Sequence, residues 1–221
     1  MESHQLINQT SLSVEYYTPP ELVEPTRKLF GHIDLDPTSC EFANSRYIKA
    51  DRFFTKEDDG LTQKWYGRVW MNHPFGKAEN PCKNPCTKKT CIKRGYHLTE
   101  YLPGNANWID KMVEEYLSGR VTEACCITFA ATSEDWFRPL LVRPQCYLIP
   151  RTNYLGPDGK PVEGVSKGSV ITYFGTNVDG FYHAYKKFGE IRVNYSACAA
   201  LAEFSTVSEP SEVSLRRNLR V

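Results

Sequence analysis

The alternation of apolar and polar positions along the chain predicts helices and strands in turn. The clearest helical stripe has apolar residues three and four positions apart. It begins after Asn107, ends at Gly119 and consists of Trp108, Met112, Val113, Tyr116 and Leu117. A second helix is predicted from Thr18 to Gly31, and Pro25 should kink or split it because proline lacks a backbone N–H. Shorter helices are predicted at 41–47, 133–137 and 181–188.

Apolar runs of strand length lie between these helices, at 32–36, 68–71, 124–130, 146–149 and 170–174. Strands that alternate with helices are typical of an α/β fold, in which a mostly parallel sheet carries helices on both faces. We therefore predict one α/β domain over residues 1–221. Residues 77–104 show no period and are predicted to be an insertion, whereas the polar residues 206–221 are expected to be a flexible tail.

Composition narrows the class of protein. The chain is 41% apolar and 24% charged, which excludes disordered, collagenous and coiled-coil proteins. No apolar run approaches the roughly 20 residues that a membrane-spanning helix needs, and the first residues lack the features of a secretory signal. We expect a soluble cytoplasmic protein without a membrane partner. The net charge of +1 does not by itself indicate a polyanion as partner.

Polar side chains follow two of the predicted strands. Asp34 and Asp36 end one strand, and Asn72 to Phe75 follow another. In an open α/β sheet, ligands bind beyond the carboxyl ends of the strands, so these groups can face one crevice. The 72–75 loop offers an amide oxygen, a backbone carbonyl and an aromatic ring, which suit the exocyclic amine of a planar base. Asn72 and the carbonyl could each accept one N–H while Phe75 stacks on the base.

Several motifs in this order resemble the phage N-6-adenine DNA methyltransferase (Dam-like) family. Taken alone, each of them is also found in ordinary turns, so the resemblance depends on their order and spacing. It covers about residues 15–175. The motifs are Tyr17-Thr18-Pro19, Asp34-Leu35-Asp36-Pro37, Asp58-Asp59-Gly60-Leu61, Trp65, Val69-Trp70-Met71-Asn72-His73-Pro74-Phe75-Gly76, residues 132–137 and Lys167-Gly168-Ser169-Val170.

The resemblance implies a transfer of methyl from S-adenosylmethionine to N6 of a flipped-out adenine in DNA, on a Rossmann-like sheet. It also implies a phage- or prophage-encoded protein that acts in a bacterial host cell. The residues that match the catalytic loop are Asn72, His73, Pro74 and Phe75. The residues that match the cofactor side are Tyr17, Thr18, Pro19, Asp34, Asp36, Pro37 and, more loosely, Asp59.

One position departs from the family pattern, because His73 stands where the loop usually has the first of two prolines. If the critical acceptor is the carbonyl of His73, the chemistry survives, but the loop is expected to be less rigid. Two alternatives stay open, the first because cytosine and RNA bases present a similar exocyclic amine and the second because of His73. One is a methyltransferase that acts on cytosine N4 or on RNA, and the other is a metal-stabilised nucleic-acid-binding protein with impaired catalysis.

Four possible metal ligands lie close together in the insertion. Cys82, Cys86, Cys91 and His97 are separated by three, four and five residues. This spacing predicts one structural zinc ion, because sulfur and imidazole ligands at such short intervals can converge on a tetrahedral site. Another metal or free thiols remain alternatives. Disulfides are not expected in a cytoplasmic protein.

The insertion also concentrates positive charge. Residues 77–97 contain six Lys and Arg side chains against one Glu, a net charge of +5 in a chain whose total is +1. We predict that this segment binds DNA phosphates, with a solvated basic loop as the alternative. The residues proposed for phosphate contact are Lys88, Lys89, Lys93 and Arg94.

Overall fold

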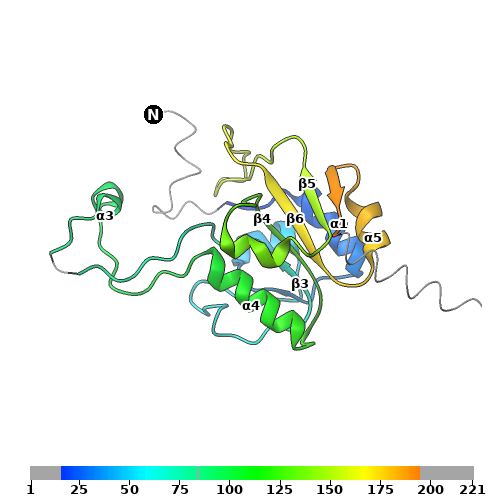
Figure 1. Ribbon diagram of the computed structural model, residues 1–221, viewed down its shortest axis with the longest axis horizontal. Helices are drawn as coiled ribbons and strands as arrows, with labels where there is room; N and C mark the ends of the chain where they lie inside the picture. The colour runs from blue at the N-terminus through cyan, green and yellow to red at the C-terminus, as the bar shows by residue number, and fades with distance from the viewer. Residues whose placement is uncertain (1–15, 84, 195–221) are drawn as a thin grey trace, which may run out of the picture.

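The computed structural model describes residues 16–83 and 85–194, except the side chains of Lys93 and Arg94, so the predicted tail at 206–221 lies outside the described residues. Within them a seven-stranded sheet has the order β2-β1-β3-β4-β6-β5-β7 (Figure 1). Its strands are β1 (Leu35–Asp36), β2 (Arg52–Phe53), β3 (Gly67–Met71), β4 (Val121–Phe129), β5 (Gln145–Leu148), β6 (Ser169–Phe174) and β7 (Gly189–Arg192).

The α-helices are α1 (Pro20–Phe30), α2 (Glu41–Ala43), α3 (Lys89–Arg94), α4 (Asn105–Leu117) and α5 (Val178–Tyr185). A π-helical turn, η2 (Asn44–Ile48), continues α2, and a 3-10 helix, η3 (Asp135–Leu140), precedes β5. In the part of the chain that is described, no helix combines the length and the apolar character needed to cross a bilayer. The α/β class predicted from the alternation of strands and helices is confirmed.

The prediction of a mostly parallel sheet is correct for only half of it. β2, β1, β3 and β4 are parallel neighbours, whereas β6 pairs antiparallel with both β4 and β5, and β7 pairs antiparallel with β5. The connection from β5 to β6 contains no helix. Two parallel neighbours would normally need a crossover helix between them. The lack of a helix between β5 and β6 therefore favours antiparallel pairing, which the alternation of strands and helices alone does not predict.

Two apolar layers cover the sheet, one on each face. Successive side chains of β4 alternate between them, with Cys125 and Ile127 in one core cluster and Ala124 and Cys126 in the other. Residues of α1 and α5 belong to the first cluster, and residues of α4 and η3 belong to the second. Helices therefore lie on both faces, as predicted, and Figure 1 shows α1 and α5 together on the side away from α4.

Two details of the predicted helices differ in the structure. Pro25 is buried inside α1 and does not split it. Leu117 belongs to the predicted apolar face of α4 but is 71% exposed, whereas Ile109 and Glu115 are fully buried. Glu115 tolerates burial because its carboxylate pairs with Lys111 at 2.7 Å and also with an arginine just beyond the helix. A charged residue on the buried face cannot be recognised from apolar spacing.

Substitution of Met112 and Leu117 tests which face of α4 is packed. Met112 is completely buried, so Met112→Ala should lower the free energy of unfolding by about 2–5 kcal/mol. Leu117→Ala should change it by no more than about 0.5 kcal/mol, because the side chain is mostly in solvent. Urea denaturation of the two variants beside the unchanged protein measures both values. A larger loss for Leu117→Ala would contradict the orientation of α4.

Candidate active site

The carboxyl ends of β1 and β3 form the candidate site. From β1 the chain passes to β2 on one side and then returns to form β3 on the other side of β1. Such a reversal of strand order is a topological switch point, where connections diverge and leave a crevice beyond the strand ends. Leu35 is in register with Val69 in the parallel β1–β3 pair. Asp36 therefore ends β1 beside the strand that leads into Asn72.

Asn72 is tied to the segment that precedes α1. Its Nδ2 donates to the backbone carbonyl of Tyr16 at 3.2 Å. Since a carbonyl can only accept, this contact fixes which side of the amide carries nitrogen and leaves Oδ1 as the acceptor on the other side. The contact also brings the sequence-predicted residues Thr18 and Pro19, which are both buried, toward the 72–75 loop. The Thr18 hydroxyl is buried and has no hydrogen-bond partner among the described residues.

The other residues of the loop differ in exposure. His73 is buried, and its Nε2 lies 3.0 Å from Oδ1 of Asn105. Burial lowers the pKa of His73 to about 4, so the imidazole is neutral near pH 7. Phe75 is half-buried, with its ring centroid 4.5 Å from that of Phe129, whereas Pro74 is exposed. The loop is thus anchored by two side chains while its outer surface remains accessible.

Asp36 is a buried carboxyl group at the end of β1. It accepts hydrogen bonds from the backbone N–H and the hydroxyl of Thr38, at 3.0 and 3.1 Å. Burial nevertheless raises the pKa of Asp36 to about 6, because desolvation outweighs these hydrogen bonds. In its ionised form, the buried Asp36 carboxylate can accept further hydrogen bonds from hydroxyl or amino groups of a polar ligand.

Pro37 follows Asp36 and is buried. Its carbonyl lies so close to Gly60 that a Cβ at Gly60 would overlap it, so the turn that contains Asp59 packs directly against the end of β1. Asp59 itself is exposed, with φ of 49°, and its Oδ1 accepts from the backbone N–H of Leu61 at 3.3 Å. The structure therefore brings Asp59 near Pro37, in a turn that its own carboxylate helps to stabilise.

Tyr17 contributes mainly to packing. Its backbone forms an antiparallel bridge with Leu155, with hydrogen bonds of 2.8 and 2.9 Å in the two directions. Its ring packs against Phe42 at 5.4 Å and Tyr47 at 6.0 Å between centroids. This packing fixes the segment whose neighbouring residues reach Asn72.

Asp34 does not join the other sequence-predicted residues. Its carboxylate accepts hydrogen bonds from the backbone N–H and from Nε of Arg68, at 2.7 and 2.9 Å. Burial alone would raise the pKa of Asp34, but these hydrogen bonds and the charge of Arg68 outweigh it and hold that pKa below its ordinary range. Arg68 lies near the start of β3, whereas Asn72 follows its end. Asp34 is therefore at the opposite end of the sheet from the 72–75 loop.

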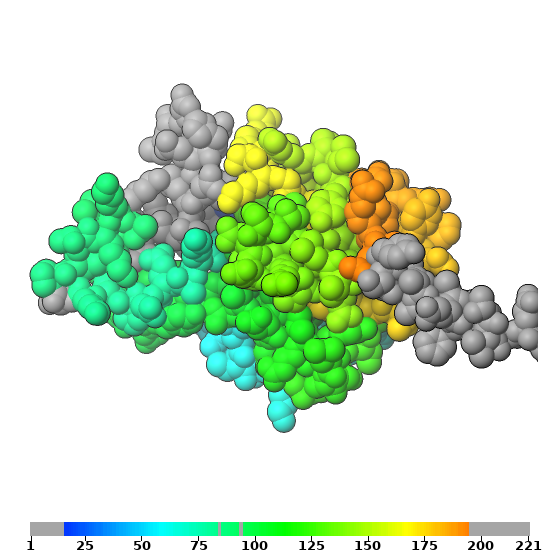
Figure 2. Space-filling model, viewed as in Figure 1, coloured from blue at the N-terminus to red at the C-terminus, as the bar shows by residue number. Residues whose placement is uncertain are grey.

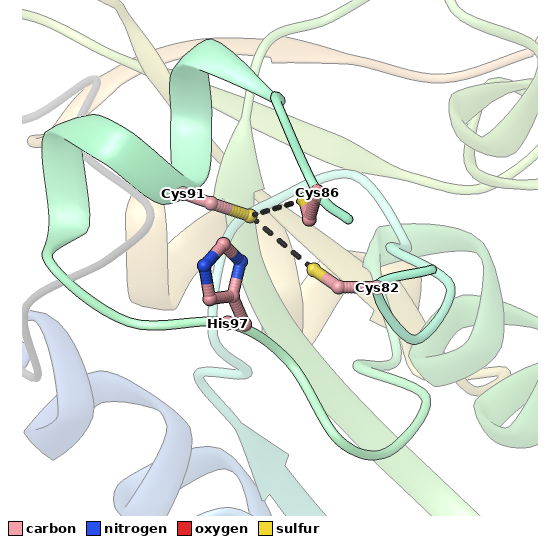
Figure 3. A group of neighbouring side chains, drawn as sticks. All are labelled: Cys82, Cys86, Cys91 and His97. Atoms are coloured by element: carbon pink, nitrogen blue, oxygen red, sulfur yellow. Dashed lines mark hydrogen bonds between the residues drawn. The ribbon is translucent and has the colours of Figure 1, made fainter. Parts of the chain in front are cut away.

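All four predicted metal ligands come together in the insertion (Figure 3). The Sγ atom of Cys91 lies 3.3 Å from that of Cys82 and 3.6 Å from that of Cys86, and the ligand atoms of these residues and His97 all lie within 4.8 Å of one another. The backbone N–H of Leu98 donates to Sγ of Cys82 at 3.3 Å. This cluster of three thiols and one imidazole could hold a metal ion.

The insertion projects from the body of the molecule (Figure 2). Its two ends run antiparallel, with a bridge between Glu79 and Leu102, and the helix α3, which the sequence did not predict, lies far from the sheet (Figure 1). Lys88 and Lys89 are exposed at the start of α3. The side chains of the other two residues proposed for phosphate contact, Lys93 and Arg94, lie outside the described part of the chain.

Sequence reasoning missed several neighbours of the 72–75 loop. Asn105 contacts His73, and Phe129 and Tyr154 surround Phe75 with centroid distances of 4.5 and 6.0 Å. Nζ of Lys167 lies 5.3 Å from the centroid of the Phe129 ring. These residues are far from the loop in sequence, and only the tertiary structure brings them together.

A comparison with known protein families identifies the family of the chain. The family model of DNA N-6-adenine-methyltransferase (Dam) matches residues 9–177, a range that includes the 72–75 loop, Asp36 and the whole insertion. No curated protein and no solved structure gives a match. At the level of the family, this match implies methylation of adenine N6 in DNA. The chain belongs to the DNA N-6-adenine-methyltransferase (Dam) family.

Proposed function

We propose that this protein transfers the methyl group of S-adenosylmethionine to N6 of an adenine that is flipped out of DNA. The observation that carries the proposal is the position of the 72–75 loop at a topological switch point, beside Asp36 and the segment that contains Thr18. We further infer that the parallel half of the sheet is the Rossmann-like part that holds the cofactor.

The amide of Asn72 and the carbonyl of His73 would orient the target amine. The lone pair of adenine N6 is delocalised into the ring and attacks poorly until both N–H groups point at acceptors. Because the Tyr16 carbonyl holds Nδ2 of Asn72, Oδ1 is available to accept one of these N–H groups. The oriented N6 lone pair would then attack the methyl carbon of the donor as its bond to sulfur breaks, and the N6 proton would leave to solvent.

Phe75 would stack on the flipped base. The rings of Phe129 and Tyr154 hold Phe75 in place, so little side-chain freedom is lost when the base arrives. Stacking of a base on an aromatic side chain contributes about 1–3 kcal/mol. This is comparable with the few kcal/mol that unstacking and unpairing of the target base cost. Lys167 is exposed next to Phe129 and suits a phosphate beside the target nucleotide.

The residues around Asp36 fit S-adenosylmethionine. The bound cofactor would supply an activated methyl group on a positively charged sulfur. The buried hydroxyl of Thr18 has no partner among the described residues, and the Asp36 carboxylate can accept from hydroxyl or amino groups. Asp59, in the turn against Pro37, would lie near the cofactor adenine. Asp34 is not included, because Arg68 occupies its carboxylate at the other end of the strand.

Asn72→Ala should lower the turnover number for methyl transfer to DNA by about 100-fold or more, because one acceptor for the N6 hydrogens is lost. The measurement is incorporation of isotope-labelled methyl groups into DNA, followed by nucleoside analysis. Calorimetry should still show binding of S-adenosylmethionine, but with lower affinity, because Asn72→Ala also removes the contact to the Tyr16 carbonyl that holds the segment of Thr18 and Pro19.

Asn153→Ala serves as the control for this test, because Asn153 is exposed and outside the loop. Undiminished incorporation in Asn72→Ala would contradict the assigned role. Methylated cytosine, or methylated RNA in place of DNA, would instead support the alternative acceptors, which present a similar exocyclic amine. Binding of nucleic acid without binding of S-adenosylmethionine and without methyl transfer would support the metal-stabilised binding protein with impaired catalysis.

We propose one structural zinc ion for the cluster of Cys82, Cys86, Cys91 and His97. Three thiolates and one imidazole are a common ligand set for tetrahedral zinc, and the N–H of Leu98 directed at a sulfur is the kind of contact that orients such a ligand. Among these four ligands only Cys91 is buried, so a metal would supply stability that an apolar core does not.

Elemental analysis should find about one zinc per chain, and Cys91→Ser should lose most of it because a hydroxyl is a poor zinc ligand. Cys40→Ser is the matched control, since Cys40 lies outside the cluster and serine is also a good helix cap. Absence of metal from protein purified without chelators would contradict the zinc proposal without affecting the catalytic one.

We also propose that Lys88 and Lys89 contact DNA phosphates. Both are exposed on the projecting insertion, where the local charge is strongly positive. The insertion begins directly after the 72–75 loop, so phosphates bound there would lie on the same DNA as the target base.

The double substitution Lys88→Glu and Lys89→Glu should weaken DNA binding at low salt by at least about tenfold. It should also reduce the slope of log K against log salt by about one for each lost contact. The control reverses the charges of Lys28 and Lys186. Lys28 is exposed on α1, and Lys186 is exposed just after α5. Both helices lie on the opposite side of the molecule from α3 in Figure 1. Fluorescence anisotropy with duplex DNA measures both effects, and equal slopes for the two double variants would contradict the phosphate contacts.

A further inference from the structure

The 72–75 loop and the insertion are anchored by the same residue, Asn105. This residue begins α4 and directly follows the insertion. Its backbone N–H donates to the carbonyl of Gly76 at 2.8 Å, and its Oδ1 accepts from the N–H of Gly76 at 3.2 Å. The preceding Gly104 lies so close to Ala78 that no side chain would fit. The two ends of the insertion are thus fastened to each other immediately after the loop.

Oδ1 of Asn105 is also the partner of His73, at 3.0 Å from Nε2. The N–H of Gly76 can only donate, so the Asn105 amide must present its oxygen at this point, and Nε2 of His73 must carry the proton. The other ring nitrogen, Nδ1, is buried and has no hydrogen-bond partner in the described residues. Low solvent access also keeps the ring neutral, since burial lowers the pKa of His73 to about 4.

Aromatic neighbours fix the plane of the imidazole. The Phe75 ring meets it edge-on, with centroids 5.3 Å apart and an interplanar angle of 87°. Trp108, in the first turn of α4, lies 6.4 Å away on a tilted plane. Rotation of the His73 side chain would therefore disturb the ring that is proposed to receive the base.

We propose that His73 and Asn105 are positioning residues whose hydrogen bond sets the direction of the loop carbonyl and of Phe75, and couples the loop to the root of the insertion. This inference rests on the proposed methyl transfer. The buried His73 side chain would give the 72–75 loop the rigidity that a second proline would otherwise provide. The insertion, which is proposed to bind DNA, and the loop, which is proposed to receive the base, would then keep a fixed position relative to each other.

Two substitutions of His73 separate the hydrogen bond from simple packing. The side-chain amide of glutamine can place an N–H near the position of Nε2, whereas that of asparagine reaches only the position of Nδ1. His73→Asn should lower kcat by about 10- to 100-fold. His73→Gln should recover at least about tenfold of that loss, while Kd for S-adenosylmethionine and for DNA stays within about twofold in both variants. Equal losses in the two variants would overturn the proposal.

A double-mutant cycle on kcat tests whether the two residues act together. His73→Asn combined with Asn105→Leu should be no slower than the slower single variant, because both remove the same hydrogen bond. Multiplied losses would mean that the residues act independently. Leu117→Ala, at the far end of α4, is the control. If Asn105→Leu fails to fold, the comparison of the two His73 variants decides.

Nuclear magnetic resonance tests the geometry without any dependence on activity. Imidazole nitrogen spectra at pH 7 should show a neutral His73 with its proton on Nε2, and a proton on Nδ1 or a charged ring would overturn the proposal. If the spectra agree but the unchanged protein methylates nothing, the proposed function fails and the positioning role fails with it. If the protein is active and the His73 variants lose nothing, only the positioning role is overturned.

Discussion

The parallel pairing of β1 with β3 is the constraint on which the candidate site depends. The chain leaves β1 for β2 and returns on the other side as β3, so the ends of these two neighbouring strands meet where their connections diverge. Asp36 and Asn72 reach the same edge for this reason alone, since they are far apart in sequence. The contact from Asn72 to the Tyr16 carbonyl then adds the segment before α1 to that edge.

Rigidity in this region comes from buried contacts. His73 is neutral and hydrogen-bonded, and Phe75 packs against Phe129 while Pro74 remains exposed. The insertion has a different source of order. Its cysteines and His97 converge at one point, and its two ends pair as an antiparallel stalk that stands away from the sheet. A segment with so little apolar burial needs local fastening, which the proposed zinc ion and the Asn105 contacts to Gly76 would supply.

The sequence predicted much of this arrangement because its main signals are local. Strand length, helical spacing and the short intervals between the cysteines are properties of neighbouring residues, and the four predicted ligands indeed cluster. What it could not predict depends on distant partners. Asp34 and Asp36 are the same residue type two positions apart, yet only Asp34 meets Arg68 from the adjacent strand. Likewise, the hydrogen bond of His73 depends on Asn105, and the direction of β6 depends on how the chain connects β5 to β6.

Amide hydrogen exchange, measured with and without S-adenosylmethionine, shows whether the cofactor binds at the carboxyl ends of β1 and β3, because it locates the ligand without requiring catalysis. We expect the cofactor to slow exchange in residues 16–19, 36–38 and 72–76, which lie at or next to the carboxyl ends of β1 and β3. Exchange near Asp34 and Arg68, at the other end of the same strands, should stay unchanged. Protection confined to that opposite end, or no protection at saturating cofactor, would contradict the location of the site.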